Sequence, residues 1–484
     1  MTDALTVGAV VANAARGAPD ATAAVVEGRH YTLAELDRAG TGAAYCLVAA
    51  GVSFGDVILV LADTSFDLLA AFVGCARAGA VFAPLNPALD AATMAAAVER
   101  TGAAWCLADD YHTDRANGLG RPVITVRQLG RGARVAQLPA VASHHGHVAF
   151  FTSGSTGSPK AALLAHGTSV LRSHPGSQLE PRGAALCPYP LFHMGGWTIA
   201  LQQWHARAGV VFVTGTDPHT LAAALVDHEI ERFNAIPALW TRLAQHLGAD
   251  GPGAFPRLRF ADTGTSPTSI DLLETIAAMA PNATVRVFYG STEAGNVASL
   301  HHEDLATRPG SCGRPGPLTQ VELGPDGELL VRGPLLFDGY IGDPDANAEA
   351  LVDGWYHSGD QAVVDDDGYL SIIGRLGTII RTGGEAVVPD HVEAALRSHP
   401  DIADVAVFGV TDDQWGELVW AAVVAEVELT PDDLARHLGH DGPHPLARHE
   451  HPRRLLRLAE LPRTAATGQV DRHRLGQLAS QVDG

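Results

Sequence analysis

The chain has 484 residues, of which 46% are hydrophobic, and its formal net charge is −21. Such a length suggests about three domain-sized units, and this apolar content is ample for large buried cores. The acidity, together with the lack of a basic patch, argues against a nucleic-acid-binding protein.

The sequence also limits the cellular location. No apolar run is long enough to span a bilayer, and Val57–Ala62 is a short strand pattern instead. The first residues lack a basic segment followed by a cleavage site, so we expect no signal peptide. Five scattered cysteines without a CxxC pair argue against a disulfide framework or a zinc site. We therefore expect a cytoplasmic protein with no membrane insertion.

The first half of the chain alternates helical and strand patterns. Helical spacing covers 33–52 and 65–80, and buried-strand patterns cover 56–62 and 81–86. The alternation predicts βα units and a mostly parallel sheet. Further strand patterns continue it at 185–192, 209–215, 258–264 and 284–290.

The pattern changes from about residue 316 to short strands joined by turns. Pro325–Gly327 and Asp367–Gly368 are hairpin turn signals. A compact α+β pattern follows Arg375. We therefore predict a core domain over 1–375 and a second domain over 376–484. A histidine-rich stretch at 437–452 has irregular spacing interrupted by prolines, so a solvated loop is favoured over a metal site.

A loop rich in hydroxyls and glycines, TSGSTGSPK (Thr152–Lys160), follows the strand pattern HVAFF and ends in the chain's only lysine. Glycines let backbone N–H groups approach an anion, and the hydroxyls and the lysine add donors and charge. The GKS or GKT ending of a Walker loop is absent. A flexible linker is the alternative, but a linker rarely follows a buried strand directly. The loop predicts phosphate binding.

This loop resembles the signature of the adenylate-forming superfamily, which includes acyl-CoA synthetases, peptide-synthetase adenylation domains and luciferases. Other matches follow in the family's order. They are PLFHMGG (190–196), DTGTSP (262–267), YGSTE (289–293), GWYHSGD (354–360), GYLSIIGR (368–375) and RTGGEAVV (381–388). The resemblance implies an α/β fold. A large N-terminal domain of mixed parallel sheets with helices and a small β-barrel-like subdomain would precede a small α+β C-terminal domain that rotates about a hinge.

The resemblance implies a nucleotide site for ATP or AMP. The carboxylate of Asp360 would accept the ribose hydroxyls, Arg375 would reach the ribose or phosphate, and Tyr289 would stack on adenine. Glu293 is a hard oxygen ligand suited to Mg²⁺. For Asp360 and Glu293, a turn cap or a surface acid is the alternative. The implied nucleotide-binding residues are Thr152, Ser153, Gly154, Ser155, Thr156, Gly157, Lys160, Thr265, Ser266, Pro267, Phe288, Tyr289, Gly290, Ser291, Thr292, Asp360, Ile372 and Arg375.

The segment FHMGGW points to a free-standing acyl-CoA synthetase. Peptide-synthetase domains normally hold an amino group with an aspartate here, whereas this chain has His193 and no acid. The apolar segments nearby favour a bulky hydrophobic acid, such as a terpenoid or polyketide acid, with a fatty or aryl acid as an alternative. The expected acyl pocket comprises His193, Trp197, Trp204, Trp240, Gly290, Asn296 and Val297, although each tryptophan could also be a core residue.

The last motif, PRTAATGQ (462–469), departs from the family form Pro-Arg-Thr-x-Thr-Gly-Lys. Gln469 stands where a lysine normally bridges the substrate carboxylate and the α-phosphate during adenylation. Aiming a positive charge at developing negative charge is worth about 10²–10³ in rate. Arg463, Arg472 or Arg474 could substitute, but a planar guanidinium does not easily replace an ammonium. The expected catalytic residues are His193, Thr292, Glu293, Gly383, Gly384, Glu385 and Gln469, the last as a lost lysine.

The glycine-rich loop Arg381–Val388 resembles the loop that presents the CoA thiol, and it is intact. Our leading hypothesis is therefore a ligase impaired in adenylation, which makes acyl-CoA from a preformed acyl-adenylate and CoA. It would need Mg²⁺ only if adenylation occurs, and a companion adenylating enzyme could supply its substrate. A complete ATP-dependent acyl-CoA synthetase and a non-catalytic regulator that binds AMP or acyl-adenylate are the alternatives. The oligomeric state stays open.

Overall fold

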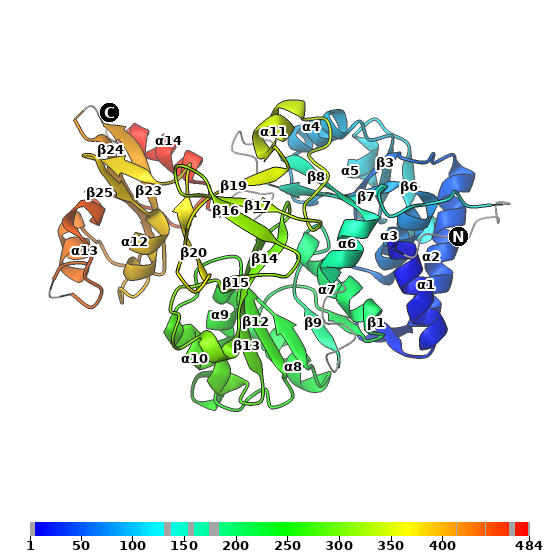
Figure 1. Ribbon diagram of the computed structural model, residues 1–484, viewed down its shortest axis with the longest axis horizontal. Helices are drawn as coiled ribbons and strands as arrows, with labels where there is room; N and C mark the ends of the chain where they lie inside the picture. The colour runs from blue at the N-terminus through cyan, green and yellow to red at the C-terminus, as the bar shows by residue number, and fades with distance from the viewer. Residues whose placement is uncertain are drawn as a thin grey trace. The chain divides into compact units, whose positions relative to one another are not determined.

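A computed structural model describes residues 5–129, 137–152, 159–173, 183–412, 414–440, 442–463 and 470–482 (Figure 1). By the contacts within it, the chain divides into two compact units over these described residues. Unit 1 comprises Met1–Val321, Val331–His357 and Asp366–Leu370. Unit 2 comprises Glu322–Leu330, Ser358–Asp365 and Ser371–Gly484. Unit 2 thus takes in the predicted C-terminal domain and three short segments before it, Glu322–Leu330, Ser358–Asp365 and residues 371–375.

One sheet of unit 1 has the strand order β15-β14-β13-β12-β11-β9-β10-β1-β2. Pairing is parallel from β13 to β1 and antiparallel toward both edges. This is the pattern expected from alternating strands and helices. The strands are β1 (Thr22–Val26), β2 (Arg29–Thr32), β9 (Ala185–Cys187), β10 (Val210–Phe212), β11 (Arg232–Asn234), β12 (Phe260–Gly264), β13 (Thr284–Ser291), β14 (Gly295–Leu300) and β15 (Arg314–Pro315).

A second sheet of unit 1 has the order β6-β5-β3-β4-β7-β8. Its pairs are parallel except for β7–β8, which is antiparallel. Strands such as β3 are nearly continuous apolar runs because both faces of a parallel sheet are covered. The strands are β3 (Val57–Leu61), β4 (Val81–Pro84), β5 (Trp105–Ala108), β6 (Val123–Thr125), β7 (Gly146–Thr152) and β8 (Lys160–Ala165).

Several helices of unit 1 begin at sequence signals typical of helix starts. Thr32 and Glu35 form a capping box at the start of α2, and α8 and α9 have proline in the first turn. A core built around Phe233 and Trp240 lies where α8–α10 pack on the first sheet (Figure 1). The helices are α1 (Val7–Gly17), α2 (Leu33–Ala50), α3 (Phe66–Ala78), α4 (Ala91–Thr101), α5 (Thr113–Asn117), α6 (His166–Ser173), α7 (Met194–His205), α8 (Pro218–Asp227), α9 (Pro237–Leu247), α10 (Ile270–Met279) and α11 (Pro344–Ala350), with 3₁₀ turns η1 (Val126–Gln128), η2 (Gly248–Asp250) and η3 (His302–Asp304).

A further sheet has the order β16-β17-β19-β18, with β20 paired to β19. Gly327 and Gly368, in the two predicted turns, take φ values of 73° and 81°. These left-handed conformations favour glycine, so the turn predictions are confirmed. The strands are β16 (Gln320–Leu323), β17 (Glu328–Arg332), β18 (Leu351–Val352), β19 (Trp355–Val364) and β20 (Leu370–Arg375).

Unit 2 also contains a sheet of order β22-β21-β24-β23, in which β25 pairs parallel with β24. One apolar cluster joins this sheet to α12 and α13, and another joins it to α14 through Leu475 and Ala479. No helix in the described part of the chain is long and apolar enough to cross a membrane. The elements are β21 (Ile380–Thr382), β22 (Glu385–Val387), α12 (Pro389–Leu396), β23 (Asp404–Asp412), β24 (Gly416–Val424), α13 (Pro431–His437), η4 (Arg448–Glu450), β25 (Arg454–Arg457) and α14 (Arg472–Val482).

Candidate active site

The two ends of the predicted phosphate loop are held by an antiparallel strand pair. Thr152 at the end of β7 lies opposite Lys160 at the start of β8. Lys160 is half-buried, and its Nζ lies 5.2 Å from the centre of the Tyr340 ring, a cation–π distance. The loop residues predicted between these ends, Ser153, Gly154, Ser155, Thr156 and Gly157, lie outside the described residues.

The predicted nucleotide and magnesium motif begins at the end of β13. Phe288, Tyr289, Ser291 and Thr292 are half-buried, and Glu293 is buried with 7% exposure. Glu293 Oε1 accepts a hydrogen bond from the Tyr340 hydroxyl at 2.9 Å. Lys160 and Glu293 therefore both contact Tyr340, which joins the phosphate loop to the motif. Sequence analysis did not select Tyr340 because nothing in its local pattern reports this contact.

Gly290 marks a close approach of two chain segments. A Cβ atom there would lie 2.0 Å from the carbonyl oxygen of Gly295, so only glycine fits. Gly264, at the end of β12, is similar because a Cβ would lie 2.2 Å from the carbonyl oxygen of Phe288. Neighbouring backbone fills the space that a side chain would need, so strand packing requires both glycines. The buried carboxylate of Glu293 and the ammonium of Lys160 have the chemistry that suits a magnesium nucleotide.

The predicted adenine-loop residues Thr265, Ser266 and Pro267 follow β12 and are exposed. Thr265 has a φ of 67°, which is a left-handed conformation. This φ favours glycine, and a β-branched residue at such a φ is strained. The main chain at Thr265 therefore has a conformation that usually requires glycine, although the residue is threonine.

The predicted acyl-pocket residues do not form one group. Trp197, Trp204 and Trp240 are at most 2% exposed. Their indole N–H groups donate to the carbonyl oxygens of Leu191, Ala23 and Asp262 respectively. Such contacts are those of core tryptophans, the alternative that the sequence left open. Gly290 and Asn296 are exposed, and Val297 is buried.

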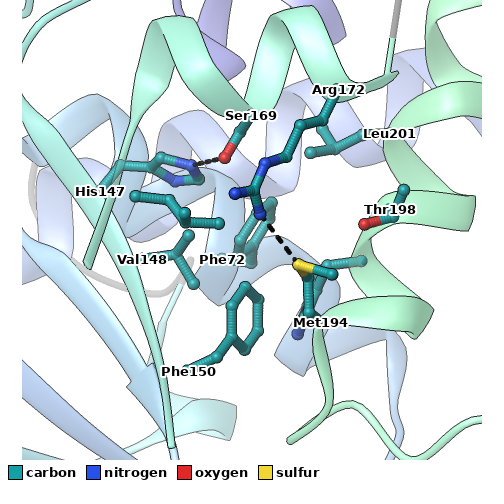
Figure 2. A pocket seen from close by; sticks show the side chains of 11 residues that line it. Phe72, His147, Val148, Phe150, Ser169, Arg172, Met194, Thr198 and Leu201 are labelled. Atoms are coloured by element: carbon teal, nitrogen blue, oxygen red, sulfur yellow. Dashed lines mark hydrogen bonds between the residues drawn. The ribbon is translucent and has the colours of Figure 1, made fainter. Parts of the chain in front are cut away.

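A cavity of about 10 Å³, enough for about one water, is lined in part by residues of α6 and α7 (Figure 2). Of the predicted acyl residues, only Trp197 is among those that line this cavity. Its lining residues are Phe72, His147, Val148, Phe150, Leu164, Ser169, Arg172, Met194, Trp197, Thr198 and Leu201. His193 precedes α7, is half-buried and lies 4.5 Å from Phe192 between ring centres. Burial lowers the pKa of His193, which favours the neutral imidazole.

Arg172, on α6, was missed by the sequence analysis. Its guanidinium donates to the carbonyl oxygens of Thr292 and Glu293 at 2.8 and 2.9 Å. The only sequence signal is a basic residue within the apolar pattern that follows the phosphate loop.

In unit 2, the predicted ribose residues lie together. Arg375 Nε donates to Asp360 Oδ1 at 2.8 Å, with the Asp360 side chain 11% exposed and that of Arg375 60% exposed. Ile372 is half-buried on β20. The ion pair brings Asp360 and Arg375 together, and the binding of a ribose by these two residues stays a prediction.

The predicted CoA loop is a hairpin between β21 and β22. Gly383 and Gly384 form its turn with φ values of 61° and 86°, and Glu385 is exposed. The N–H of Gly383 donates to the carbonyl oxygen of Trp415 at 2.8 Å. A Cβ on Gly383 would lie 2.9 Å from the Trp415 ring, so this glycine is required by conformation and by packing. Gln469 lies outside the described residues.

Among the described residues, the group of acidic and histidine side chains close enough to hold a metal ion is Asp63, Asp109 and His112. Asp109 already accepts from the backbone N–H groups of Asp63 and His112, at 2.7 and 2.8 Å. Loop capping explains this group. The described residues of the histidine-rich stretch 437–452 are not part of this group.

The family model described as AMP-binding enzyme matches residues 11–341, and the model of the AMP-binding enzyme C-terminal domain matches 391–467. The chain belongs to the AMP-binding enzyme family. The resemblance to the adenylate-forming superfamily and its acyl-CoA synthetases is thereby confirmed.

Relatives of this AMP-binding enzyme include a feruloyl-CoA synthase from an Amycolatopsis species, 32% identical over 85% of this chain and 87% of the relative. A ligase from Mycobacterium tuberculosis, which joins CoA to a methyl-dioxo-octahydroindenyl propanoyl group, is 31% identical over 98% of this chain and 99% of the relative. The o-succinylbenzoate CoA synthetase of Bacillus subtilis, solved with its acyl-adenylate, has a TM-score of 0.88 at 24% identity, covering 96% of this chain and 97% of that one. The same synthetase is also known with ATP and magnesium. The predicted α/β fold with a large N-terminal and a small C-terminal domain is confirmed.

Proposed function

We propose that this AMP-binding enzyme is an acyl-CoA ligase that acts on a preformed acyl-adenylate and is weak in making that adenylate. The CoA sulfur attacks the acyl carbonyl carbon, a C–S bond forms, and the C–O bond to the phosphate breaks. AMP leaves, and the thiol proton passes to solvent. The observation that carries the proposal is glutamine at position 469 combined with the engagement of the neighbouring arginines.

Each arginine that could supply the lost charge has a partner within unit 2. Arg463 Nη2 lies 2.7 Å from Asp404, and Arg474 Nη1 donates to Gln477 at 3.0 Å. Arg472 Nη2 lies 2.5 Å from Glu393 and 3.1 Å from Asp390. A guanidinium shared by two carboxylates is poorly suited to meet a third carboxylate and a phosphate. The ion pairs of Arg463 and Arg472 support an adenylation step that lacks its cation, whereas the partner of Arg474 is a neutral amide.

The second step needs alignment more than charge, because AMP is a good leaving group. The hairpin at Gly383–Gly384 presents bare backbone at the predicted CoA loop, and the contact of Gly383 with Trp415 fixes its shape. This preserved loop supports thioester formation. Asp360 and Arg375 support a role in holding the ribose of the adenylate.

The substrate we propose is a bulky, ring-bearing hydrophobic carboxylic acid, such as an acid of secondary metabolism. Two relatives above 30% identity are a feruloyl-CoA synthase and a CoA ligase for an indenyl propanoyl group, which supports this class. The buried tryptophans do not contribute to the argument. A companion adenylating enzyme would supply the acyl-adenylate.

The test supplies a panel of ring-bearing acids in two forms, as free acid with MgATP or as synthetic acyl-adenylate, with CoA in both arms. We expect acyl-CoA at ordinary rates only in the adenylate arm. Equal rates in both arms would contradict the proposal and establish a complete ligase. Binding of acyl-adenylate without turnover would indicate a regulator instead.

A complete ATP-dependent acyl-CoA synthetase is the second candidate. Lys160 and Glu293 both remain, and each lies against Tyr340. A protein that no longer binds MgATP has little need of them. The B. subtilis structure with ATP and magnesium supports the same alternative.

A further inference from the structure

The guanidinium of Arg172 joins three separate segments of unit 1. Nη1 and Nη2 donate to the carbonyl oxygens of Thr292 and Glu293, at 2.8 and 2.9 Å. Nε and Nη2 both donate to the carbonyl oxygen of Leu335, at 2.8 and 2.6 Å. Nη1 also contacts Met194 Sδ at 3.1 Å, and Figure 2 shows this contact beside the cavity. One side chain on α6 therefore fixes the nucleotide motif, a neighbouring loop and the start of α7.

The chemistry of these contacts is unusual for a half-buried cation. Its hydrogen-bond partners are main-chain carbonyls and a thioether, whereas buried charges normally pair with carboxylates. Burial lowers the pKa of Arg172 to about 10, and the nearby charges of Glu293 and Asp338 oppose that shift. The side chain stays protonated at neutral pH. Charged donors make strong hydrogen bonds to carbonyl groups, so the backbone of Thr292 and Glu293 is firmly held.

The carboxylate of Glu293 is held from its other end. Tyr340 donates to Oε1, and the ring of Tyr340 lies under Lys160. Arg172 fixes the main chain of this residue and Tyr340 fixes its side chain. The Glu293 carboxylate, as a metal ligand held by both of these contacts, has little freedom to rotate away from a bound cation.

We propose that Arg172 is a positioning residue of this ligase, which holds the Thr292 hydroxyl and the Glu293 carboxylate toward the magnesium nucleotide and links them through Met194 to the start of α7. The inference rests on the proposed function for its substrate, but it concerns nucleotide binding and can be tested without turnover. A purely structural role predicts a different result, because loss of fold stability would not change the affinity for magnesium selectively.

Arg77 on α3 provides a matched control. It is also half-buried, and it donates to the carbonyl oxygens of Asp37 and Gly8 at 2.8 and 3.0 Å. Unlike Arg172, it also forms an ion pair with the carboxylate of Asp37, at 2.5 Å. Its Nη1 donates to Thr41 Oγ1 at 2.6 Å. Arg77→Met removes comparable main-chain contacts, together with one ion pair, from a place outside the nucleotide motif, so it controls for the loss of a half-buried arginine.

The experiment measures the dissociation constants of AMP and of MgATP by calorimetry at several magnesium concentrations, together with the melting temperature. In Arg172→Met we expect the dissociation constant of MgATP to rise about 10–100-fold, as for other residues that orient metal ligands, and that of AMP to rise less. Arg172→Lys should recover part of the loss because the charge remains. Arg77→Met should lower the melting temperature and leave both constants unchanged. A folded Arg172→Met protein with wild-type MgATP affinity would overturn the proposal.

Two further measurements keep the test decisive. If Arg172→Met does not fold, the test uses Arg172→Lys instead. Wild-type MgATP affinity in Arg172→Lys would then overturn the proposal. Met194→Leu should raise the KM for acyl-adenylate several-fold without changing the AMP constant, and unchanged kinetics would overturn the link to α7. If the wild-type protein makes no acyl-CoA, the proposed function fails while the MgATP comparison still tests Arg172. A wild-type protein that binds neither nucleotide overturns both proposals.

Discussion

Arg472 Nη2 lies 2.5 Å from Glu393 Oε1 and so joins the first turn of α14 to α12. The Glu393 side chain is only 5% exposed and also accepts from Arg397 at 2.8 Å and from the N–H of Val407 at 2.9 Å. Burial raises the pKa of Glu393, and the charges of Arg472 and Arg397 oppose the shift. Arg472 is therefore committed to holding a buried carboxylate.

The first prediction concerns stability. Arg472→Met leaves Glu393 buried with one cation fewer, and we expect unit 2 to lose about 2 kcal/mol, less than for a fully buried pair because Arg397 remains. Urea denaturation measures the change, and the exposed Arg474→Met is the control, with an expected change within about 0.5 kcal/mol. If Arg472→Met were fully stable but lost adenylation, Arg472 would be the missing cation, and the proposed function would fail.

The second prediction restores the charge. Gln469→Lys should raise adenylation, measured as ATP–pyrophosphate exchange, by about 10²-fold or more. Thioester formation from synthetic acyl-adenylate should change little, because that step does not use the lysine. Gln469→Leu is the control, and its ATP–pyrophosphate exchange should not rise. Unchanged exchange in the lysine variant would favour the complete ligase, in which this position is not limiting.

Much of the fold and the motif placement could be predicted from the sequence. Buried strand runs and helix caps are local signals, and the predicted turns at Gly327 and Gly368 have the expected backbone. The family motifs identified Glu293, but not the partners of its side chain and main chain, Tyr340 and Arg172. Those contacts join residues far apart in the chain, and no periodicity reports them.

The tryptophans show a second limit of sequence analysis. Trp204 and Trp240 lie in apolar segments, and an apolar segment has the same composition whether it lines a pocket or fills a core. Only the packing of the two tryptophans distinguishes a pocket from a core. Their indole N–H groups donate to main-chain carbonyl oxygens, as in a core. Local composition could not distinguish them.

The third prediction concerns strain at Thr265. Its φ of 67° suits glycine, and a β-branched residue there stores about 1–3 kcal/mol. Thr265→Gly should therefore raise the free energy of unfolding by about 1 kcal/mol after the entropy cost of glycine. Glu229→Gly relieves a φ of 47° elsewhere and is the control. If Thr265 contacts the nucleotide, only Thr265→Gly will change AMP affinity, and a loss of stability would contradict the argument.

The fourth prediction concerns acid sensitivity. His147 is 1% exposed, lies 4.6 Å from His166 between ring centres, and bonds Ser169 through Nε2 at 2.7 Å. Burial, and then the charge of His166, lower the pKa of His147 well below 6.5. The unfolded chain takes up this proton near 6.5 and the folded chain does not. The free energy of unfolding should therefore fall as pH drops below about 6.5, by up to about 1.4 kcal/mol per pH unit for this proton. Urea denaturation across this range should show the slope, and His147→Gln should reduce it; an equal slope in both proteins would contradict the assignment.

The fifth prediction separates the two steps at the CoA hairpin. Gly384 has a φ of 86° and no neighbour that a Cβ would meet within 4 Å, so Gly384→Ala adds backbone strain without a clash. Gly368 is matched in both respects, with a φ of 81° in another hairpin. Both alanine variants should lose a similar stability, about 1 kcal/mol or slightly more. Only Gly384→Ala should slow acyl-CoA formation from acyl-adenylate, by about tenfold, because a shifted turn misaligns the thiol.

AMP affinity should stay at the wild-type value in both variants. Equal slowing by the two substitutions would mean that strain acts through general stability, and the hairpin would then have no particular role in presenting CoA.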